Sequence, residues 1–226
     1  MLAKTLLFLA ACSAALAPAE APQPEATPPV GAAPCIACRA PIADPTALFS
    51  SADWVALQDG EVLSQAISRE SADNDLAGAM RAESLIRRPP ANVWAVLTDF
   101  EHWPEFMPLI RGTRVERRVG ARLWVEQQYR ILLVPLAHTS IYELDPGDGR
   151  LSWRLDEEQP HDIAASQGEW ELVAVSAGRE TLVRYDARMS AGRAVPEFVE
   201  RMLRERSLEQ LLAGLRAEVL RRYPEN

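Results

Sequence analysis

Six segments between Arg111 and Met189 alternate apolar and polar residues with a period of two, and this pattern constrains the fold of the chain more than any other feature. Such alternation is typical of strands that bury one face. Turn-forming residues, among them Gly120, Pro135 and Gly149, separate the segments. Consecutive strands joined by short turns predict an antiparallel sheet. The expected strands are 111–119, 121–134, 137–144, 150–158, 168–175 and 180–189.

A long amphipathic segment follows these strands, from Pro196 to Tyr223. Its apolar residues recur at helical spacing opposite many Arg and Glu side chains, which predicts one helix of roughly 25 residues. A strongly bent sheet can wrap such a helix and leave a space between the two. The apolar stripe consists of Phe198, Met202, Leu208, Leu211, Leu212, Leu215 and Val219.

One further strand, 79–87, opens the main body and ends at Pro89-Pro90. The spacing of apolar residues from Val93 to Leu97 then predicts a short helix. A proline-stiffened turn follows from Asp99 to Pro108, in which we expect Asp99 and Glu105 to accept hydrogen bonds from nearby backbone N–H groups. Upstream, the sequence predicts a short helix or turn within 48–57, a turn at Gly60, a strand within 61–68 and a loop over 70–75.

The expected inner faces of the strands are rich in apolar and aromatic side chains, with few polar atoms. That composition is typical of ligand pockets, but it is also typical of an ordinary core. Both interpretations stay open at this stage. The inward-facing set is Val115, Leu123, Val125, Gln127, Tyr129, Ile131, Trp153, Leu155, Trp170, Leu172, Val183, Tyr185 and Met189.

Catalytic signatures are sparse. The sequence has no G-x-S-x-G elbow, no H-E-x-x-H motif and no phosphate-binding loop. The three histidines are isolated: His102 lies in an exposed turn, His138 at the start of a strand and His161 in a loop. None has a carboxylate or nucleophile at a spacing that predicts contact. We therefore expect no catalytic residue, no metal site and no cofactor.

The first 19 residues have one lysine, a short apolar run and small residues, which is the layout of a secretory signal peptide. Two processing routes are open. Cleavage after Ala17-Pro18-Ala19 would release a chain that starts at Glu20. Alternatively, Leu9 to Cys12 resembles the lipobox of bacterial lipoproteins, so that residues 1–11 would be removed and a lipid on Cys12 would tether the protein to a membrane. Either route predicts export to the periplasm or cell envelope.

Residues 20–45 form an expected linker, because eight prolines fall between Pro18 and Pro45. Its Cys35-Ile-Ala-Cys38 motif favours a structural disulfide or an idle pair, since zinc would need four ligands and a redox motif needs a strand before it and a helix after it. The folded domain is then 46–226.

Composition excludes some partners and leaves others open. The 226 residues are 48% hydrophobic and 25% charged, as in ordinary globular proteins. A net charge of −8 disfavours nucleic acid or anionic lipid as the main partner. The sequence does not indicate the oligomeric state.

The segment VWAVLTDFEHWPEFMPLIRGTRVERR, preceded by IRRPPAN, resembles the START-related (SRPBCC) superfamily, and within it the coenzyme Q-binding and polyketide cyclase-like branch. The segments GEWELVAV and TLVRYDARMSAGRAVPEF and the long helix are also similar, so the resemblance covers about Gly60 to Tyr223. It implies an α+β helix-grip fold: a curved antiparallel sheet around a long C-terminal helix, with two short helices after the first main strand. Members bind lipids, quinones, sterols or polyketides in a hydrophobic tunnel, and some catalyse cyclisation or hydrolysis there.

We therefore expect the chain to bind or transfer a hydrophobic small molecule or lipid, of quinone-like, fatty or polyketide-like character. The alternatives are a cyclase or hydrolase that uses the same cavity, and a ligand-free module that binds a partner. Five of the expected ligand-binding positions come from the family resemblance. The other five come from the expected inner faces of the strands. Together they are Trp103, Phe106, Met107, Gln127, Tyr129, Trp153, Trp170, Tyr185, Phe198 and Met202.

Overall fold

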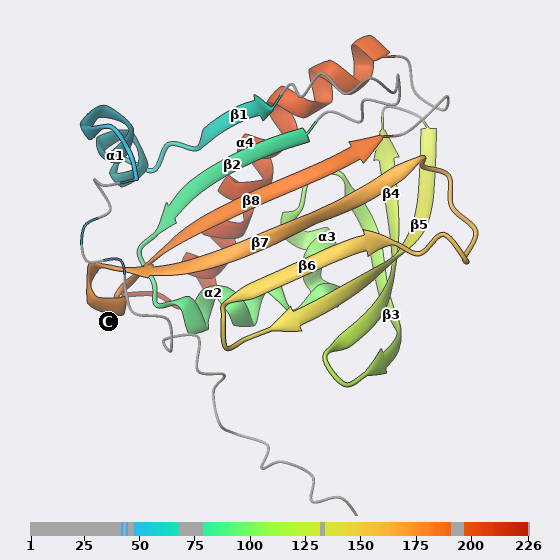
Figure 1. Ribbon diagram of the computed structural model, residues 1–226, viewed down its shortest axis with the longest axis horizontal. Helices are drawn as coiled ribbons and strands as arrows, with labels where there is room; N and C mark the ends of the chain where they lie inside the picture. Colours follow the sequence, from blue (N-terminus) through green and yellow to red (C-terminus); the bar gives the residue numbers. More distant parts are fainter. Residues whose placement is uncertain are drawn as a thin grey trace, which may run out of the picture. The chain divides into compact units, whose positions relative to one another are not determined.

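The computed structural model describes residues 42, 44, 48–67, 79–131, 134–190 and 197–225, with side chains of the last segment described from Leu208 onward. In these residues, eight antiparallel strands form one curved sheet in the order β1-β2-β8-β7-β6-β5-β4-β3 (Figure 1). The strands are β1 (Leu63–Ile67), β2 (Ala79–Ile86), β3 (Ile110–Val119), β4 (Arg122–Ile131), β5 (Val134–Asp145), β6 (Arg150–Leu155), β7 (Ala165–Val175) and β8 (Glu180–Ser190).

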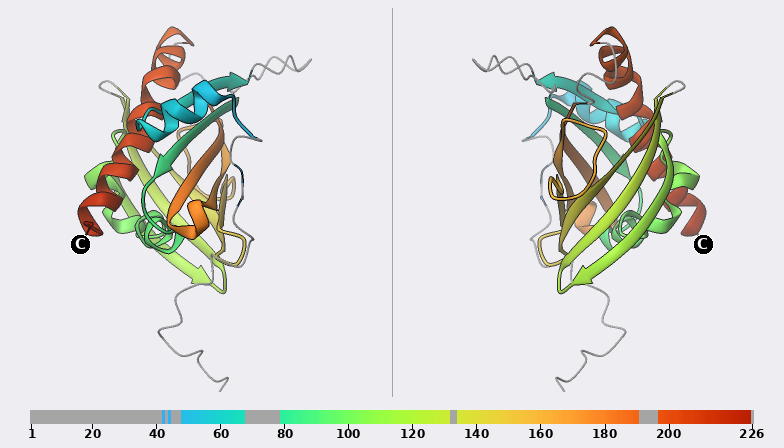
Figure 2. Two further views of the ribbon diagram at one scale, coloured as in Figure 1. Left: turned by 90° about the vertical axis from the view of Figure 1, so that its left-hand side faces the viewer. Right: turned by 90° about the vertical axis from the view of Figure 1, so that its right-hand side faces the viewer.

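The helical segments include one long C-terminal helix, as the sequence predicts. Side views show this helix running along one face of the sheet (Figure 2). The predicted α+β helix-grip fold is therefore confirmed, including the short helices after the first main strand. The helical elements are α1 (Ser51–Gln58), α2 (Pro90–Leu97), the 3-10 turns η3 (Phe100–His102) and η4 (Ser176–Gly178), α3 (Trp103–Phe106) and α4 (Glu197–Arg222).

The segment from α2 to α3 joins distant parts of the sheet. It leaves β2, which pairs with β1 and β8, and enters β3 at the opposite edge. Pro90 occupies the first turn of α2, where its missing N–H leaves no hydrogen bond unmade. The buried face of α2, including Val93, Val96 and Leu97, packs in the same core as α4. This crossing places the residues after α2 at one end of the space between sheet and helix.

The main core lies between the inner face of the sheet and α4. Leu208, Leu212, Leu215 and Val219 of α4 are all buried there, which confirms that part of the predicted stripe. A smaller cluster lies on the other face of the sheet, where α1 contributes Leu57. The strand residues of this second cluster are Leu85, Val173, Val175 and Leu182.

The structure corrects three strand boundaries. Pro135 was expected to separate two strands, but it lies inside β5. The orientation of Ala137, two residues further along the strand, explains why β5 tolerates this proline. The N–H of Ala137 points away from β4 and donates to Asp162 Oδ2 over 2.9 Å. Pro135 has the same orientation, on a side where this part of β5 has no described strand partner, so its missing N–H breaks no ladder.

The other two boundaries concern β6 and β7. The strand β6 ends at Leu155 rather than at residue 158, because a turn begins after the N–H of Asp156 donates to Thr139 O at 2.9 Å. The strand β7 begins at Ala165, before Gly168, which the sequence prediction took as its start. The predicted loop over 70–75, the signal peptide, most of the linker, and Cys12, Cys35 and Cys38 lie outside the described residues.

Candidate functional site

A cavity of about 170 Å³ lies between the inner face of the sheet and α4. Its walls come from β2, from the segment 103–110, from strands β4 to β8 and from α4. Most of the lining side chains are apolar or aromatic, among them Met80, Leu136 and Leu208. The site is therefore an apolar space inside the grip of the sheet on the helix, which is the kind of space that takes hydrophobic ligands.

Most of the predicted ligand-binding residues meet in this cavity. They come from distant parts of the chain, and the curvature of the sheet brings them together. Their contact with a ligand remains a prediction, but their convergence on one space is a property of the structure. The predicted residues that line the cavity are Trp103, Met107, Gln127, Tyr129, Trp153, Trp170 and Tyr185.

Three predicted residues are not among these lining residues. Phe106 is half-buried and packs against the core, but it does not line the cavity. Its carbonyl oxygen lies so close to α4 that a Cβ on Gly214 would stand 2.2 Å from it. The backbone of Phe106 therefore lies close against α4, and its contact with a ligand stays a prediction. Phe198 and Met202 lie in α4, but their side chains are outside the described part of the chain.

Aromatic rings in contact with one another form one wall of the cavity. Trp153 stacks on Tyr185 with ring centroids 5.5 Å apart, and Tyr142 stacks on Trp153 at 6.1 Å. Trp170 packs on Tyr185 at 4.4 Å, and Trp103 meets Tyr142 edge-on at 5.6 Å. Burial raises the pKa of the Tyr142 and Tyr185 hydroxyls, so these groups stay uncharged at neutral pH.

A glycine makes room for one of these rings. Gly168 of β7 lies opposite Trp153 of β6 in the sheet register. A Cβ on Gly168 would stand 2.4 Å from two atoms of the Trp153 ring and 2.4 Å from the backbone oxygen of Asp186. The indole N–H of Trp153 donates to Ser166 Oγ over 3.2 Å. Gly168 and Ser166 together fix how Trp153 faces the cavity.

His138 lines the cavity, although the sequence analysis did not predict it there. The sequence predicts it at the start of a strand, but it lies inside β5, and the residue is only 2% exposed. Its ring stacks on Tyr129, with centroids 5.3 Å apart and planes 8° from parallel. Burial, helped by nearby His161 and opposed by Asp162, lowers the pKa of His138 to about 4. The imidazole is therefore neutral at physiological pH.

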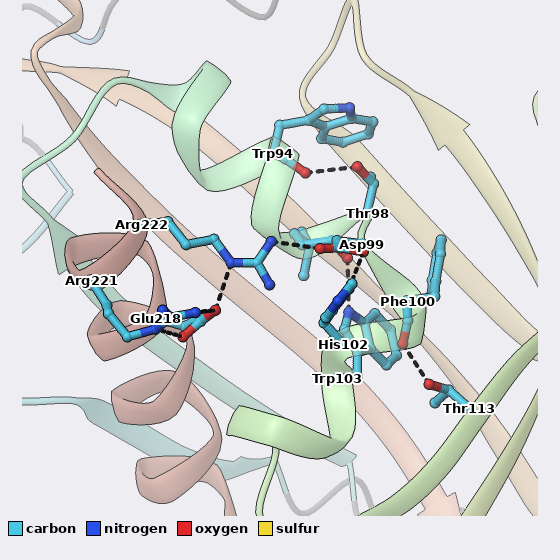
Figure 3. A network of polar contacts seen from close by, with 11 residues as sticks. Trp94, Thr98, Asp99, Phe100, His102, Trp103, Thr113, Glu218, Arg221 and Arg222 are labelled. Carbon is cyan, nitrogen blue, oxygen red and sulfur yellow. Dashed lines mark hydrogen bonds and ion pairs between the residues drawn. The ribbon is translucent and has the colours of Figure 1, made fainter. Parts of the chain in front are cut away.

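The turn after α2 is held differently from the prediction. Asp99 was expected to accept from backbone N–H groups, yet its carboxylate contacts His102 Nδ1 at 2.8 Å and Arg222 Nη1 at 2.5 Å (Figure 3). Burial would raise the pKa of Asp99, but the hydrogen bonds from Arg222 and His102 outweigh it and lower the pKa. Glu105 is exposed, and no hydrogen bond to it is seen in the described structure.

This network connects α4 to the cavity. Arg222 Nε also donates to Glu218 Oε1 over 2.6 Å, so one guanidinium joins α4 to the turn (Figure 3). The same turn carries Trp103, whose indole N–H donates to Leu97 O over 3.0 Å. Asp99 and Glu218 therefore support a cavity wall, since both carboxylates accept hydrogen bonds from arginine side chains.

Neither a metal site nor a membrane-spanning helix is found among the described residues. Among the described residues, no three His, Cys, Asp or Glu side chains gather where they could hold a metal ion. No helix in the described part of the chain combines the length and the apolar character needed to cross a membrane.

Comparison with known proteins identifies the family. A family model described as polyketide cyclase / dehydrase and lipid transport matches residues 78–219. The chain belongs to this family. The matched region contains β2 to β8 and most of α4, which are the elements that build the cavity. A comparison with curated protein sequences gives no match.

Solved structures share the fold at low sequence identity. A STAR-related lipid transfer protein from Xanthomonas axonopodis is 17% identical with a TM-score of 0.57, covering 70% of this chain and 93% of that one. Human StAR-related lipid transfer protein 5 is 12% identical with a TM-score of 0.57, covering 73% and 84%. The Zhui aromatase/cyclase from Streptomyces is 20% identical with a TM-score of 0.54, covering 64% and 94%. The START-type resemblance seen in the sequence is confirmed.

Proposed function

We propose that this protein binds and carries a hydrophobic small molecule or lipid in the cavity between the sheet and α4. The observation that carries the proposal is the cavity itself, an apolar and aromatic space of about 170 Å³ in a chain of the polyketide cyclase and lipid transport family. Each 100 Å² of apolar ligand surface buried there contributes about 2.5 kcal/mol. The cavity also argues against the alternative of a module whose own side chains fill this space.

The size of the cavity indicates what it can hold. An apolar protein cavity of about 150 Å³ accommodates benzene. A space of about 170 Å³ therefore suits a single aromatic ring, two fused rings or a short alkyl segment. A longer ligand would need part of its length outside the described walls.

Native mass spectrometry of the gently purified protein tests the proposal. We expect one small molecule per chain, or uptake of one from a panel of quinones, neutral lipids and aromatic compounds. Protein that is empty and binds no member of the panel would refute the idea. Leu211→Trp should reduce uptake because Leu211 lines the cavity from α4. Leu220→Trp is the matched control, since Leu220 is also a half-buried leucine of α4 but does not line the cavity.

A second candidate function, a cyclase-type enzyme, is favoured by His138. A buried histidine with a perturbed pKa is a recurrent feature of active sites. A general base works best when its pKa lies near the operating pH, however, and the pKa of His138 is about 4. We therefore expect a bound polyketide-like thioester to be recovered unchanged by mass spectrometry. Conversion by the wild type but not by His138→Phe would instead establish the enzyme.

We also propose the cell envelope as the place of this activity. The support is the sequence of residues 1–19, with its single lysine, apolar run and small residues. A binding protein in that compartment would move a poorly soluble molecule through an aqueous space.

A further inference from the structure

Two polar side chains face each other on the inner surface of the sheet. Gln127 of β4 and His138 of β5 are direct partners in the sheet register. Both line the cavity, and they are 1% and 2% exposed. Side chains directly opposite on neighbouring strands lie within contact distance. A polar pair therefore sits inside a space whose lining is mostly apolar or aromatic.

His138 has no hydrogen-bond partner in the described structure, at either Nδ1 or Nε2. This is unlike the indoles of Trp103 and Trp153 in the same cavity, which both donate to a protein oxygen. A buried polar group that is left unpaired costs stability, so native proteins rarely keep one without a use for it. An occupant of the cavity would supply the missing partner.

The cavity offers such an occupant no charge. None of the described residues that line it is Lys, Arg, Asp or Glu. The imidazole of His138 is itself neutral, because burial holds its pKa at about 4. An ionised carboxylate or phosphate would lose its hydration in this space and gain no counter-charge, which is strongly unfavourable.

We propose that the cavity selects uncharged hydrophobes that carry a hydroxyl or carbonyl oxygen, and that His138 holds this oxygen by a hydrogen bond. The inference rests on the proposed binding function and names the ligand class for the same cavity. A neutral imidazole has one N–H donor and one nitrogen acceptor, so it can donate to a carbonyl and either donate to or accept from a hydroxyl. Stacking on Tyr129 fixes the plane in which those two groups point.

Three probes with the same naphthalene ring separate the contributions: naphthalene, 2-naphthol and 2-naphthoate. Their dissociation constants for the purified protein are measured by calorimetry or fluorescence at neutral pH. We expect 2-naphthol to bind about fivefold more tightly than naphthalene, the gain of one net hydrogen bond. We expect 2-naphthoate to bind at least about tenfold more weakly than 2-naphthol, because its charge is buried unpaired.

Variants of the same site assign the preference to His138. His138→Phe keeps a ring that can stack on Tyr129 but removes both nitrogens, so the ratio of naphthalene to 2-naphthol dissociation constants should fall to about one. His138→Gln restores a donor and an acceptor and should recover part of the ratio. Ser140→Ala is the matched control: Ser140 is fully buried on the same strand, with no partner for its hydroxyl among the described residues, but it does not line the cavity.

Folding of the variants is read out independently by thermal unfolding. Removing an unpaired buried polar group should leave the midpoint of His138→Phe and of Ser140→Ala unchanged or raised. Of these two variants, only His138→Phe should change the ratio of the two dissociation constants.

The outcomes distinguish this inference from the proposed function. Equal ratios in the wild type and His138→Phe would overturn the role of His138 and leave hydrophobic binding intact. Tighter binding of 2-naphthoate than of 2-naphthol would overturn the selection for uncharged ligands. Failure of the folded wild type to bind all three probes, and to bind the lipid and quinone panel, would overturn the binding function and this inference with it.

Discussion

At the residue scale, the contact between Gly168 and Trp153 leaves no room for a side chain at position 168. A Cβ at Gly168 would overlap both the Trp153 ring and the Asp186 carbonyl, and a backbone atom cannot move away cheaply. We predict that Gly168→Ala lowers the free energy of unfolding by about 1–3 kcal/mol, the usual cost of overpacking. It should also weaken ligand binding, because Trp153 lines the cavity.

Urea unfolding of Gly168→Ala and Gly147→Ala measures this effect. Gly147 lies in a turn, where an added Cβ would be 3.5 Å from Asp145 Oδ1, an ordinary contact. The Gly147→Ala variant should therefore stay within about 0.5 kcal/mol of the wild type. Equal stability of the two variants would contradict the close packing of the Trp153 ring against Gly168.

Glu218 predicts a pH dependence at the same scale. Hydrogen bonds from Arg221 and Arg222, opposed by burial, lower its pKa from 4.5 to about 2. A carboxyl with a lowered pKa stabilises the fold fully above its unfolded pKa, and this stabilisation is lost as pH falls from about 4.5 through about 2. Glu218→Gln should thus cost about 1–2 kcal/mol at pH 7 and much less below about pH 2.

The measurement is urea unfolding of wild type and Glu218→Gln at neutral and acidic pH. Glu101→Gln serves as the control, since Glu101 is exposed. It should change the free energy of unfolding by less than about 0.5 kcal/mol at either pH. A gap between Glu218→Gln and wild type that is the same at both pH values would show that the ion pairs do not carry the stability.

Residue roles could be predicted where they follow from strand alternation alone. Gln127, Tyr129 and Tyr185 were placed correctly on the inner face because a period of two assigns every second side chain to it. Asp99 was assigned wrong partners, since Arg222 lies far along the chain and only the docked helix brings it near. His138 would have been found by continuing the alternation of β5 through Pro135, which puts it in phase with Leu136 and Tyr142.

At the element scale, the approach of α3 to α4 depends on Gly214. In a helix interior, alanine is favoured over glycine by about 1 kcal/mol. Here a Cβ would lie 2.2 Å from the backbone oxygen of Phe106, so the clash should exceed that gain. We predict that Gly214→Ala destabilises the protein by about 1–3 kcal/mol, against the direction of helix propensity.

Thermal and urea unfolding of Gly214→Ala and of Ala213→Gly test this contact. Ala213 is exposed on α4, so replacing it with glycine should cost only the propensity difference of about 1 kcal/mol. Stabilisation by Gly214→Ala would contradict the close packing of the two helices.

The elements themselves were largely predictable, and their ends were less so. The helix α4 and strands β2 to β8 follow from periods of 3.6 and 2, which do not depend on the rest of the fold. The ends depend on partners that the sequence does not show. Pro135 was read as a boundary because a proline inside a central strand breaks the ladder, but this part of β5 has no described strand partner on that side.

At the scale of the whole molecule, the fold explains why the cavity exists. The chain enters the sheet at the edge strand β1, adds β2 beside it and then crosses to β3 at the other edge. The remaining strands fill the sheet from β3 back to β8 beside β2. The inner face then curves around α4, and the residues after α2 form one wall of the enclosed space. The space between sheet and helix could be predicted from the family resemblance, whereas its volume and polar pair required the side chains in place.

Export is the prediction that concerns the whole chain. Residues 1–19 should direct the protein out of the cytoplasm, because a short apolar run after one lysine matches a secretory signal.

Full-length protein expressed in a bacterial host with an outer membrane should lack residues 1–11, and its intact mass shows which processing route applies. A lipidated chain begins at Cys12 and fractionates with membranes, whereas a cleaved chain begins at Glu20 and is free in the periplasm. Cys12→Ala should abolish membrane association in the first case and change nothing in the second. Protein that retains Met1 in the cytoplasm would refute export. The binding proposal would be untouched, because the described residues that line the cavity all come after Gly78.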